Sequence, residues 1–222
     1  MTNKQKSVLI LTGSPKQAGS VSGKVATSLA GFLDQKEIQT KTMSIFQTMT
    51  AQAKKKELLN HTDAADVIII ISPQYVDSLP YLVTKFLELL SHRRKNVQMT
   101  TCKQQLLAIS HCGFAEAYQN NTTLAIYNSF AVETGFEWFG GLAFGMSPIV
   151  TFPLLNLLTY RIKKALRLTA EAFAEDKRLS TETAKLMAKP FMPIWLYKIL
   201  GNITWLSLCI KNCAWKINHR PY

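Results

Sequence analysis

The chain has 222 residues, of which 47% are hydrophobic and 18% charged, and this balance excludes an intrinsically disordered protein. A chain of this length can bury one sizeable core, so we expect one main domain with an appendage. Its 26 basic and 14 acidic side chains give a formal net charge of +12. Such a charge suits anionic partners, such as phosphorylated cofactors, acidic lipid or nucleic acid, and it equally suits a basic surface that is merely solvated.

The four cysteines are too few for a disulfide framework in a chain of this length. The N-terminal residues lead from polar side chains directly into an apolar run, without the apolar core and cleavage site of a signal peptide. We therefore expect a cytoplasmic protein. No zinc shell is complete and no recognised nucleic-acid-binding motif accompanies the basic charge, so we expect neither a metal site nor a nucleic-acid partner.

The first predicted elements are two strands and two helices in alternation. Residues 7–12 (SVLILT) are short and almost wholly apolar, which is typical of a buried strand. Residues 20–34 carry apolar side chains at helical spacing. Residues 38–46 alternate polar and apolar side chains, which indicates a strand nearer the sheet edge, and a short polar helix follows over residues 54–62.

The same alternation continues in the middle of the chain. Residues 66–72 predict a second buried strand, and Pro80 opens an amphipathic helix that runs to about residue 90, with proline at a favoured first-turn position. Residues 104–110 (QQLLAIS) predict a further strand, and residues 118–134 a further helix.

A fifth strand over residues 136–144 and an amphipathic helix over residues 155–174 complete the pattern. Strands that alternate with helices require a parallel sheet with right-handed crossovers. We therefore predict an α/β fold, a flavodoxin-like doubly wound five-stranded parallel sheet of order 2-1-3-4-5. This domain is expected to span residues 1–180, and residues 181–222 to form a helical C-terminal extension.

The extension differs from the domain in composition. It holds three of the four tryptophans: Trp195, Trp205 and Trp215. Polar side chains interrupt its apolar stretches at Lys198, Asn202 and Lys211, so it lacks the roughly 20 apolar residues of a spanning helix. Two interpretations compete: a strap that packs on the domain or on a dimer partner, and an interfacial membrane helix. We favour the strap, because a neighbouring core offers cover for its aromatic side chains.

Three loops are rich in glycine, serine or proline, at residues 13–22, 73–80 and 111–115. They follow the first, third and fourth predicted strands. Because parallel strands end at the same edge of a sheet, these loops are expected to converge on one crevice, where open α/β sheets bind ligands. The pattern predicts a site that holds a phosphate at one end and a flat ring at the other.

The first loop, GSPKQAGSVSGK, matches neither of two named phosphate loops. Ala18 stands where a Walker loop needs glycine, and Val25 follows Lys24 in place of serine or threonine. Pro15 stands where the dinucleotide fingerprint has its second glycine. The loop is instead a hydroxyl-rich turn that leads into a helix N-terminus.

Such a turn can hold a dianionic phosphate without a metal, through backbone amides and the hydroxyls of Ser14, Ser20 and Ser22. Lys16 adds charge there or is simply solvated. The structural alternative is that the serines only cap the helix, a role open to Ser20 or Ser22.

The other two loops suit a flat ring. Prolines bracket residues 73–80, which stiffens the backbone, and Tyr75 offers a stacking surface with a polar tip, unless this is an ordinary turn with a half-buried tyrosine. In the third loop Gly113 permits close approach of a ligand. His111 can donate to a ring carbonyl, although a loop histidine is more often solvated. Cys112 lacks a relay of acid or base, so we expect no catalysis by its thiol.

These motifs resemble those of the flavodoxin-like NAD(P)H-dependent FMN reductases. The resemblance lies in GSPK-x-x-GSVS after the first strand, P-Q-Y-x-x-S-L-P after the buried strand that precedes the second loop, and the glycine-containing third loop. GFEWFGGLAFG is also similar, and the ending MPIWLYKILGN…W…RPY resembles a C-terminal extension in a subgroup. No cysteine precedes Cys102, so an iron–sulfur member is not expected.

The resemblance implies roles for particular residues. Those implied at the FMN phosphate are Ser14, Ser20, Val21 and Ser22, with Lys16 nearby. Those implied at the isoalloxazine are Pro73, Gln74, Tyr75, Val76 and Ser78. Those implied at the other side of the ring are His111, Cys112, Gly113 and Phe114.

The resemblance also implies an activity. A nicotinamide, NADH or NADPH, passes hydride to flavin N5, and a small electron-poor acceptor such as a quinone is then reduced, with no catalytic side chain required. A homodimer is expected. The alternative is a flavodoxin-type electron-transfer protein without its own NAD(P)H turnover, although such carriers tend to be smaller and acidic.

Overall fold

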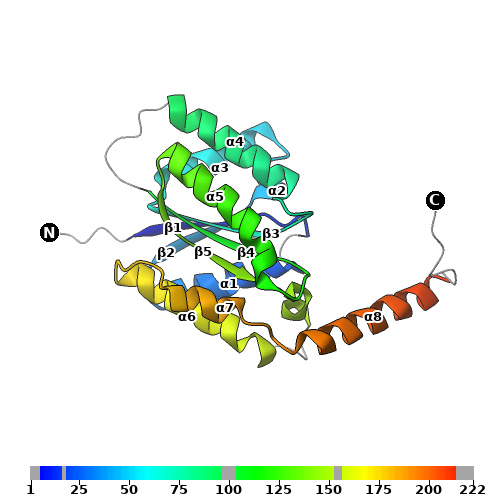
Figure 1. Cartoon of the computed structure of the whole chain (residues 1–222). Coiled ribbons are helices and arrows are strands. Elements are labelled where there is room, and N and C mark those ends of the chain that lie inside the picture. The colour runs from blue at the N-terminus through cyan, green and yellow to red at the C-terminus, as the bar shows by residue number, and fades with distance from the viewer. Residues whose placement is uncertain (1–5, 17–18, 97–103, 153–156, 214–222) are drawn as a thin grey trace.

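The structure is a computed structural model that describes residues 6–16, 19–96, 104–152 and 157–213 (Figure 1). Five parallel strands form its sheet, in the order β2-β1-β3-β4-β5, which confirms the predicted order. The strands are β1 (Ser7–Thr12), β2 (Gln39–Ser44), β3 (Val67–Pro73), β4 (Gln105–His111) and β5 (Glu137–Phe144). The flavodoxin-like topology thus follows from the alternation of strands and helices along the chain.

Helices cover both faces of the sheet (Figure 1). One face carries α1 (Val21–Asp34), α6 (Tyr160–Ala174) and α7 (Thr181–Ala188). The other carries α3 (Gln52–Ala64), α4 (Tyr81–Asn96) and α5 (Asn121–Thr134), with the short α2 (Ile45–Thr48). Two short 3-10 helices, η2 (Ala117–Asn120) and η3 (Ser147–Thr151), follow β4 and β5.

The central strand β3 shows why the sheet has two cores. All seven of its residues are buried. Because successive side chains of a strand point to opposite faces, Val67 and Ile69 pack with α1 and α6, whereas Ile68 and Ile70 pack with α4 and α5. A strand buried on both faces has a continuous apolar sequence, and this is the pattern that predicted it.

Element boundaries differ from the predictions for local reasons. The strand expected to run to residue 46 ends at Ser44, because the Ser44 hydroxyl accepts a hydrogen bond from the Gln47 amide (3.3 Å) and starts α2. The helix expected to end near residue 90 continues to Asn96. The helix expected from residue 155 is described from Tyr160 as α6, and residues 155–156 lie outside the described residues.

The extension begins as part of the domain and then leaves it. Helix α7 packs against α6 and β5. Helix α8 (Ile194–Lys211) has no buried residue, and Figure 1 shows it projecting away from the domain. The favoured strap was expected to pack on its own domain or on a dimer partner. The domain does not cover α8 beyond its first turn, and packing on a partner stays a prediction. Within the described residues, no helix combines the length and the apolar character that crossing a membrane requires.

Candidate functional site

The three glycine-, serine- or proline-rich loops meet at the carboxyl ends of the strands, as predicted. Ser22 Oγ and His111 Nε2 are 2.8 Å apart and share a hydrogen bond, which joins the first loop to the third. The Gln74 amide donates to the His111 carbonyl (2.8 Å), which joins the second loop to the third. Segments far apart in the sequence are thus held together by direct contacts at one edge of the sheet.

The predicted residues divide by exposure. Those buried are Ser14, Ser20, Ser22, Pro73, Gln74, His111 and Cys112. Those exposed are Lys16, Tyr75, Val76, Ser78, Gly113 and Phe114, and Val21 is intermediate. The hydroxyls of the first loop are therefore sheltered, while the aromatic and turn residues of the other two loops, called the rim below, are exposed.

The first loop is anchored at its start by close packing. The Gly13 amide donates to the Ile71 carbonyl (2.8 Å). A Cβ on Gly13 would lie 2.5 Å from Val83 Cγ2 and 2.9 Å from Ser72 Cβ, so only glycine lets the loop leave β1 at this point. The beginning of the loop is therefore pressed against β3 and α4.

The end of the first loop is the N-terminus of α1. Ser20 is the N-cap, and its hydroxyl accepts a hydrogen bond from the Gly23 amide (3.0 Å). The first amides of a helix have no intrahelical acceptor, so those of Val21 and Ser22 are available to a ligand. Together with the helix dipole, they favour an anion here. Ser14, in the same loop, is buried, and its hydroxyl accepts from the Lys16 amide (3.3 Å).

The second loop is a tight two-residue turn held by reciprocal backbone bonds. The Tyr75 amide donates to the Ser78 carbonyl (2.9 Å), and the Ser78 amide donates to the Tyr75 carbonyl (3.1 Å). Val76 (φ 48°) and Asp77 (φ 58°) both adopt the left-handed region, which is costly for a β-branched residue such as valine. Val76 is nevertheless 98% exposed, so packing does not explain the strain. Strained backbone of this kind gathers at ligand-binding sites.

Side chains of the second loop tie it to its surroundings. Gln74 Nε2 donates to Asp77 Oδ1 (3.2 Å), and Gln74 Oε1 accepts from Thr123 Oγ1 (3.1 Å) on α5. Tyr75 is half exposed. The turn is therefore rigid, with its tip and its tyrosine directed to solvent, where a ligand can reach them.

His111 is the last residue of β4 and is buried, so the expectation of a solvated loop histidine is wrong. Its ring stacks on Phe144 with centroids 5.4 Å apart. Burial lowers the pKa of His111 to about 3, so the imidazole is neutral at physiological pH. Among the described residues, no group pairs with His111 Nδ1, and an unpaired buried nitrogen is unfavourable unless water or a ligand reaches it. His111 is therefore a neutral bridge between loops.

Cys112 is buried, and its Sγ accepts a hydrogen bond from Asn120 Nδ2 (3.2 Å). Burial raises the pKa of the Cys112 thiol, which keeps it protonated and unreactive. The next two residues, Gly113 and Phe114, are exposed, and the Gly113 carbonyl accepts from the Tyr197 hydroxyl (2.6 Å) at the base of α8. The third loop thus contributes backbone and an aromatic surface, not a nucleophile.

A fourth loop, after β5, also joins the site and was not among the predicted site residues. The Ser147 amide donates to the Cys112 carbonyl (3.0 Å), and the Met146 amide donates to the Phe114 carbonyl (2.6 Å). A Cβ on Gly145 would lie 2.6 Å from the Phe114 carbonyl oxygen, so this contact needs glycine. The signal was present, because GMSP after the fifth strand repeats the glycine-serine-proline pattern of the other loops.

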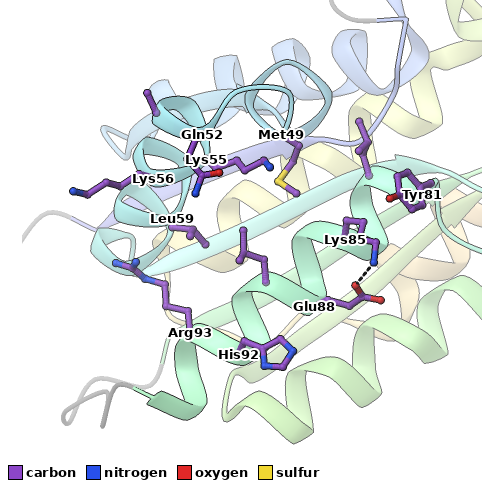
Figure 2. A pocket seen from close by; sticks show the side chains of 13 residues that line it. Met49, Gln52, Lys55, Lys56, Leu59, Tyr81, Lys85, Glu88, His92 and Arg93 are labelled. Atoms are coloured by element: carbon purple, nitrogen blue, oxygen red, sulfur yellow. Dashed lines mark hydrogen bonds and ion pairs between the residues drawn. The ribbon is translucent and has the colours of Figure 1, made fainter.

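A separate groove of about 790 Å³ lies between α3 and α4 (Figure 2). Lys55, Lys56, Lys85 and Arg93 give it a basic lining, but Lys85 pairs with Glu88 (2.9 Å). None of the predicted site residues lines this groove. It is therefore distinct from the edge where the loops meet.

Solved structures with the same fold are distant in sequence. A flavone reductase is 13% identical with a TM-score of 0.58, covering 77% of this chain, which spans 63% of that protein's length. An FMN-dependent NADH-azoreductase from Bacillus anthracis str. Ames Ancestor, in complex with FMN, is 11% identical with a TM-score of 0.55, covering 76% of this chain and 100% of that one. RosB, with bound 8-demethyl-8-formylriboflavin-5'-phosphate, is 9% identical with a TM-score of 0.59, covering 77% and 78%.

No curated protein matches the sequence. A family model does match, over residues 6–174, and its description is the flavodoxin-like fold. These residues contain the whole sheet and all four loops at its carboxyl edge. The chain therefore belongs to the family of proteins with a flavodoxin-like fold, Flavodoxin_2.

Proposed function

We propose that this protein is an FMN-dependent NAD(P)H oxidoreductase. The observation that carries the proposal is that His111 contacts both Ser22 and Gln74. These contacts hold together the helix start that favours an anion, the strained exposed turn and the aromatic rim. Phosphate at one end and a flat ring at the other is the shape of a flavin mononucleotide. The names of the azoreductase and the flavone reductase, which share the fold, support the same class of activity.

The residues at the helix start fit a phosphate. The amides of Val21 and Ser22 have no intrahelical acceptor, Ser20 caps the same helix, and Ser14 adds a buried hydroxyl in the same loop. Such a set binds a dianion through hydrogen bonds and the helix dipole, without a metal. Lys24 does not contribute, because its ammonium donates to the Thr151 carbonyl (3.1 Å) in η3.

The rim fits a planar heterocycle. Tyr75 in the second loop and Phe114 in the third are half exposed and offer flat surfaces, and at Gly113 no side chain covers the backbone. FMN held between the helix start at Ser22 and the rim would supply hydride transfer from a nicotinamide to a quinone-like or other electron-poor acceptor. Neutral, buried His111 and protonated Cys112 supply neither an acid nor a nucleophile. The protein's part is therefore to bind, orient and polarise the flavin.

The decisive test of this assignment changes the charge at Ser20 and keeps the helix cap. In Ser20→Asp the aspartate still caps α1, since aspartate and serine cap equally well, but its carboxylate repels a phosphate. We expect FMN affinity to fall by at least about tenfold, while riboflavin, which lacks the phosphate, binds as in the wild type. Ser20→Asn is the matched neutral cap and should retain FMN. Equal loss of FMN and riboflavin would contradict the phosphate assignment.

Activity is tested with the purified holoprotein. We expect FMN-dependent oxidation of NADH or NADPH when a water-soluble quinone is present, measured at the nicotinamide absorbance band. A protein that takes up no FMN would overturn the proposal. A protein that binds FMN, ignores both nicotinamides and accepts electrons from a partner reductase would instead be an electron carrier.

A further inference from the structure

Helix α8 exposes a continuous apolar stripe. Five large side chains at spacings of three and four residues form it: Trp195, Ile199, Ile203, Leu206 and Ile210. Each is between 47% and 64% exposed, whereas the apolar faces of α1, α4 and α6 are buried against the sheet. A stripe of this size on an isolated helix marks a surface that another phase or partner covers.

The charge around the stripe selects the occupant. After Lys185, which pairs with Glu182 on α7, the sequence has no acidic residue and has five basic ones: Lys189, Lys198, Lys211, Lys216 and Arg220. A second copy of the chain carries the same net charge of +12, so a basic arm laid on it meets repulsion. The surface of an anionic bilayer has the opposite charge and attracts such an arm.

The composition of α8 fits a position in the bilayer surface and not across it. No described helix qualifies as a span, and Lys198 and Asn202 interrupt the apolar sequence within the 18 residues of α8. Tryptophan, present at 195 and 205, prefers the level of the lipid headgroups. Lysine side chains beside a buried stripe reach the headgroups with their ammonium groups. These are the properties of a helix that lies in the interface.

The base of α8 is attached to the candidate site. Tyr197 donates to the Gly113 carbonyl, and Ile194 and Tyr197 pack against Ala115 and Met146. Figure 1 shows α8 leaving the domain next to η3, the element that follows β5 at the carboxyl edge of the sheet. A surface bound by α8 therefore lies on the side of the molecule that carries the exposed rim at Phe114.

We infer that α8 docks this protein on anionic lipid bilayers and presents its rim to an electron acceptor dissolved in the lipid, of the lipid-soluble quinone class. The choice of acceptor rests on the proposed function, whereas the docking does not. NAD(P)H would give up one hydride, which carries two electrons, and become NAD(P)⁺. The quinone would gain this hydride equivalent and one proton from water, and leave as the quinol.

The experiment uses the full-length holoprotein and vesicles of phosphatidylcholine, with or without phosphatidylserine. We expect sedimentation with the anionic vesicles only, with weaker binding at high salt. Ile203→Asp places a carboxylate in the middle of the stripe and should reduce binding about tenfold or more. Val132→Asp is the control, because Val132 is an exposed apolar residue on α5 (72% exposed), and it should bind as the wild type does.

Two further readouts separate the docking from the proposed function. With a water-soluble quinone, Ile203→Asp should oxidise NAD(P)H as fast as the wild type, whereas reduction of a quinone dissolved in anionic vesicles should fall with the loss of binding. If the wild type ignores anionic vesicles, the docking is wrong even when the enzyme is active. A change from dimer to monomer in Ile203→Asp, with vesicle binding unchanged, would assign α8 to a subunit interface and overturn the inference. If the protein binds anionic vesicles but takes up no added FMN, the docking stands and only the proposed function is refuted.

Discussion

Strand β3 and helix α8 are both apolar segments, yet the protein treats them in opposite ways. Every residue of β3 is buried between two layers of helices, while α8 has no buried residue at all. The apolar character of a segment therefore predicts that something covers it, but not what. For β3 the cover is the rest of this domain, and for α8 we assign it to lipid.

The largest expected effect contrasts alanine substitutions in the two segments. Ile69→Ala removes a fully buried side chain from β3 and should lower the free energy of unfolding by about 2–5 kcal/mol. Ile203→Ala removes an exposed side chain from α8 and should change it by less than about 0.5 kcal/mol. Urea denaturation in the absence of lipid measures both. A similar loss in the two variants would show that α8 is packed in solution.

A second prediction concerns pH and the buried edge. The pKa of His111 is lowered from 6.5 to about 3 by burial. Between these values the unfolded chain binds a proton that the folded chain does not, so the free energy of unfolding falls as the pH is lowered through this window. The His111 contribution should decrease by about 2 kcal/mol between pH 7 and pH 5.

His111→Gln is the control for this prediction, because glutamine keeps an amide near Ser22 and does not titrate. Urea titrations of both proteins at several pH values give the comparison. The wild type should lose more stability than the variant on acidification. Parallel pH profiles would mean that His111 is accessible to water, contrary to its burial.

The smallest expected effect is a local stabilisation of α8. Gly201 lies within α8 and a Cβ there would meet no atom within 4 Å, so Gly201→Ala should favour the helix by about 0.5–1 kcal/mol. Amide hydrogen exchange should slow by roughly twofold to fivefold in α8 and stay unchanged in β3, because the two segments share no packing. Slower exchange in both segments would indicate that α8 is coupled to the domain.

Much of the fold could be predicted because its signals are local. The strand predicted over residues 7–12 has the same bounds as β1, because so short a run of apolar side chains is typical of a buried strand. The parallel order followed from the alternation of elements and the handedness of crossovers. The ends of β2 and α4 were less predictable, because they depend on a single hydroxyl cap at Ser44 and on the absence of a breaker after residue 90.

The candidate site was predictable in its loops and less so in its details. The spacing of strands placed the three loops at one edge, but the hydrogen bond of His111 is to Ser22, which lies 89 positions away. The left-handed turn at Val76 has no signal in the sequence, because valine is among the residues least suited to it. The fourth loop, after β5, was predictable in principle, because its sequence GMSP carries the same glycine, serine and proline pattern as the other three loops.

The sequence by itself determined which segments are strands and helices, the order of the sheet and the loops at its carboxyl edge, because periodicity and connection rules act over short stretches of chain. Tertiary structure alone decided that His111 is a neutral bridge and that α8 projects into solvent. Burial is a property of what surrounds a residue. An apolar stripe in the sequence therefore predicts that some surface covers it, and only the tertiary structure shows whether that surface belongs to the domain.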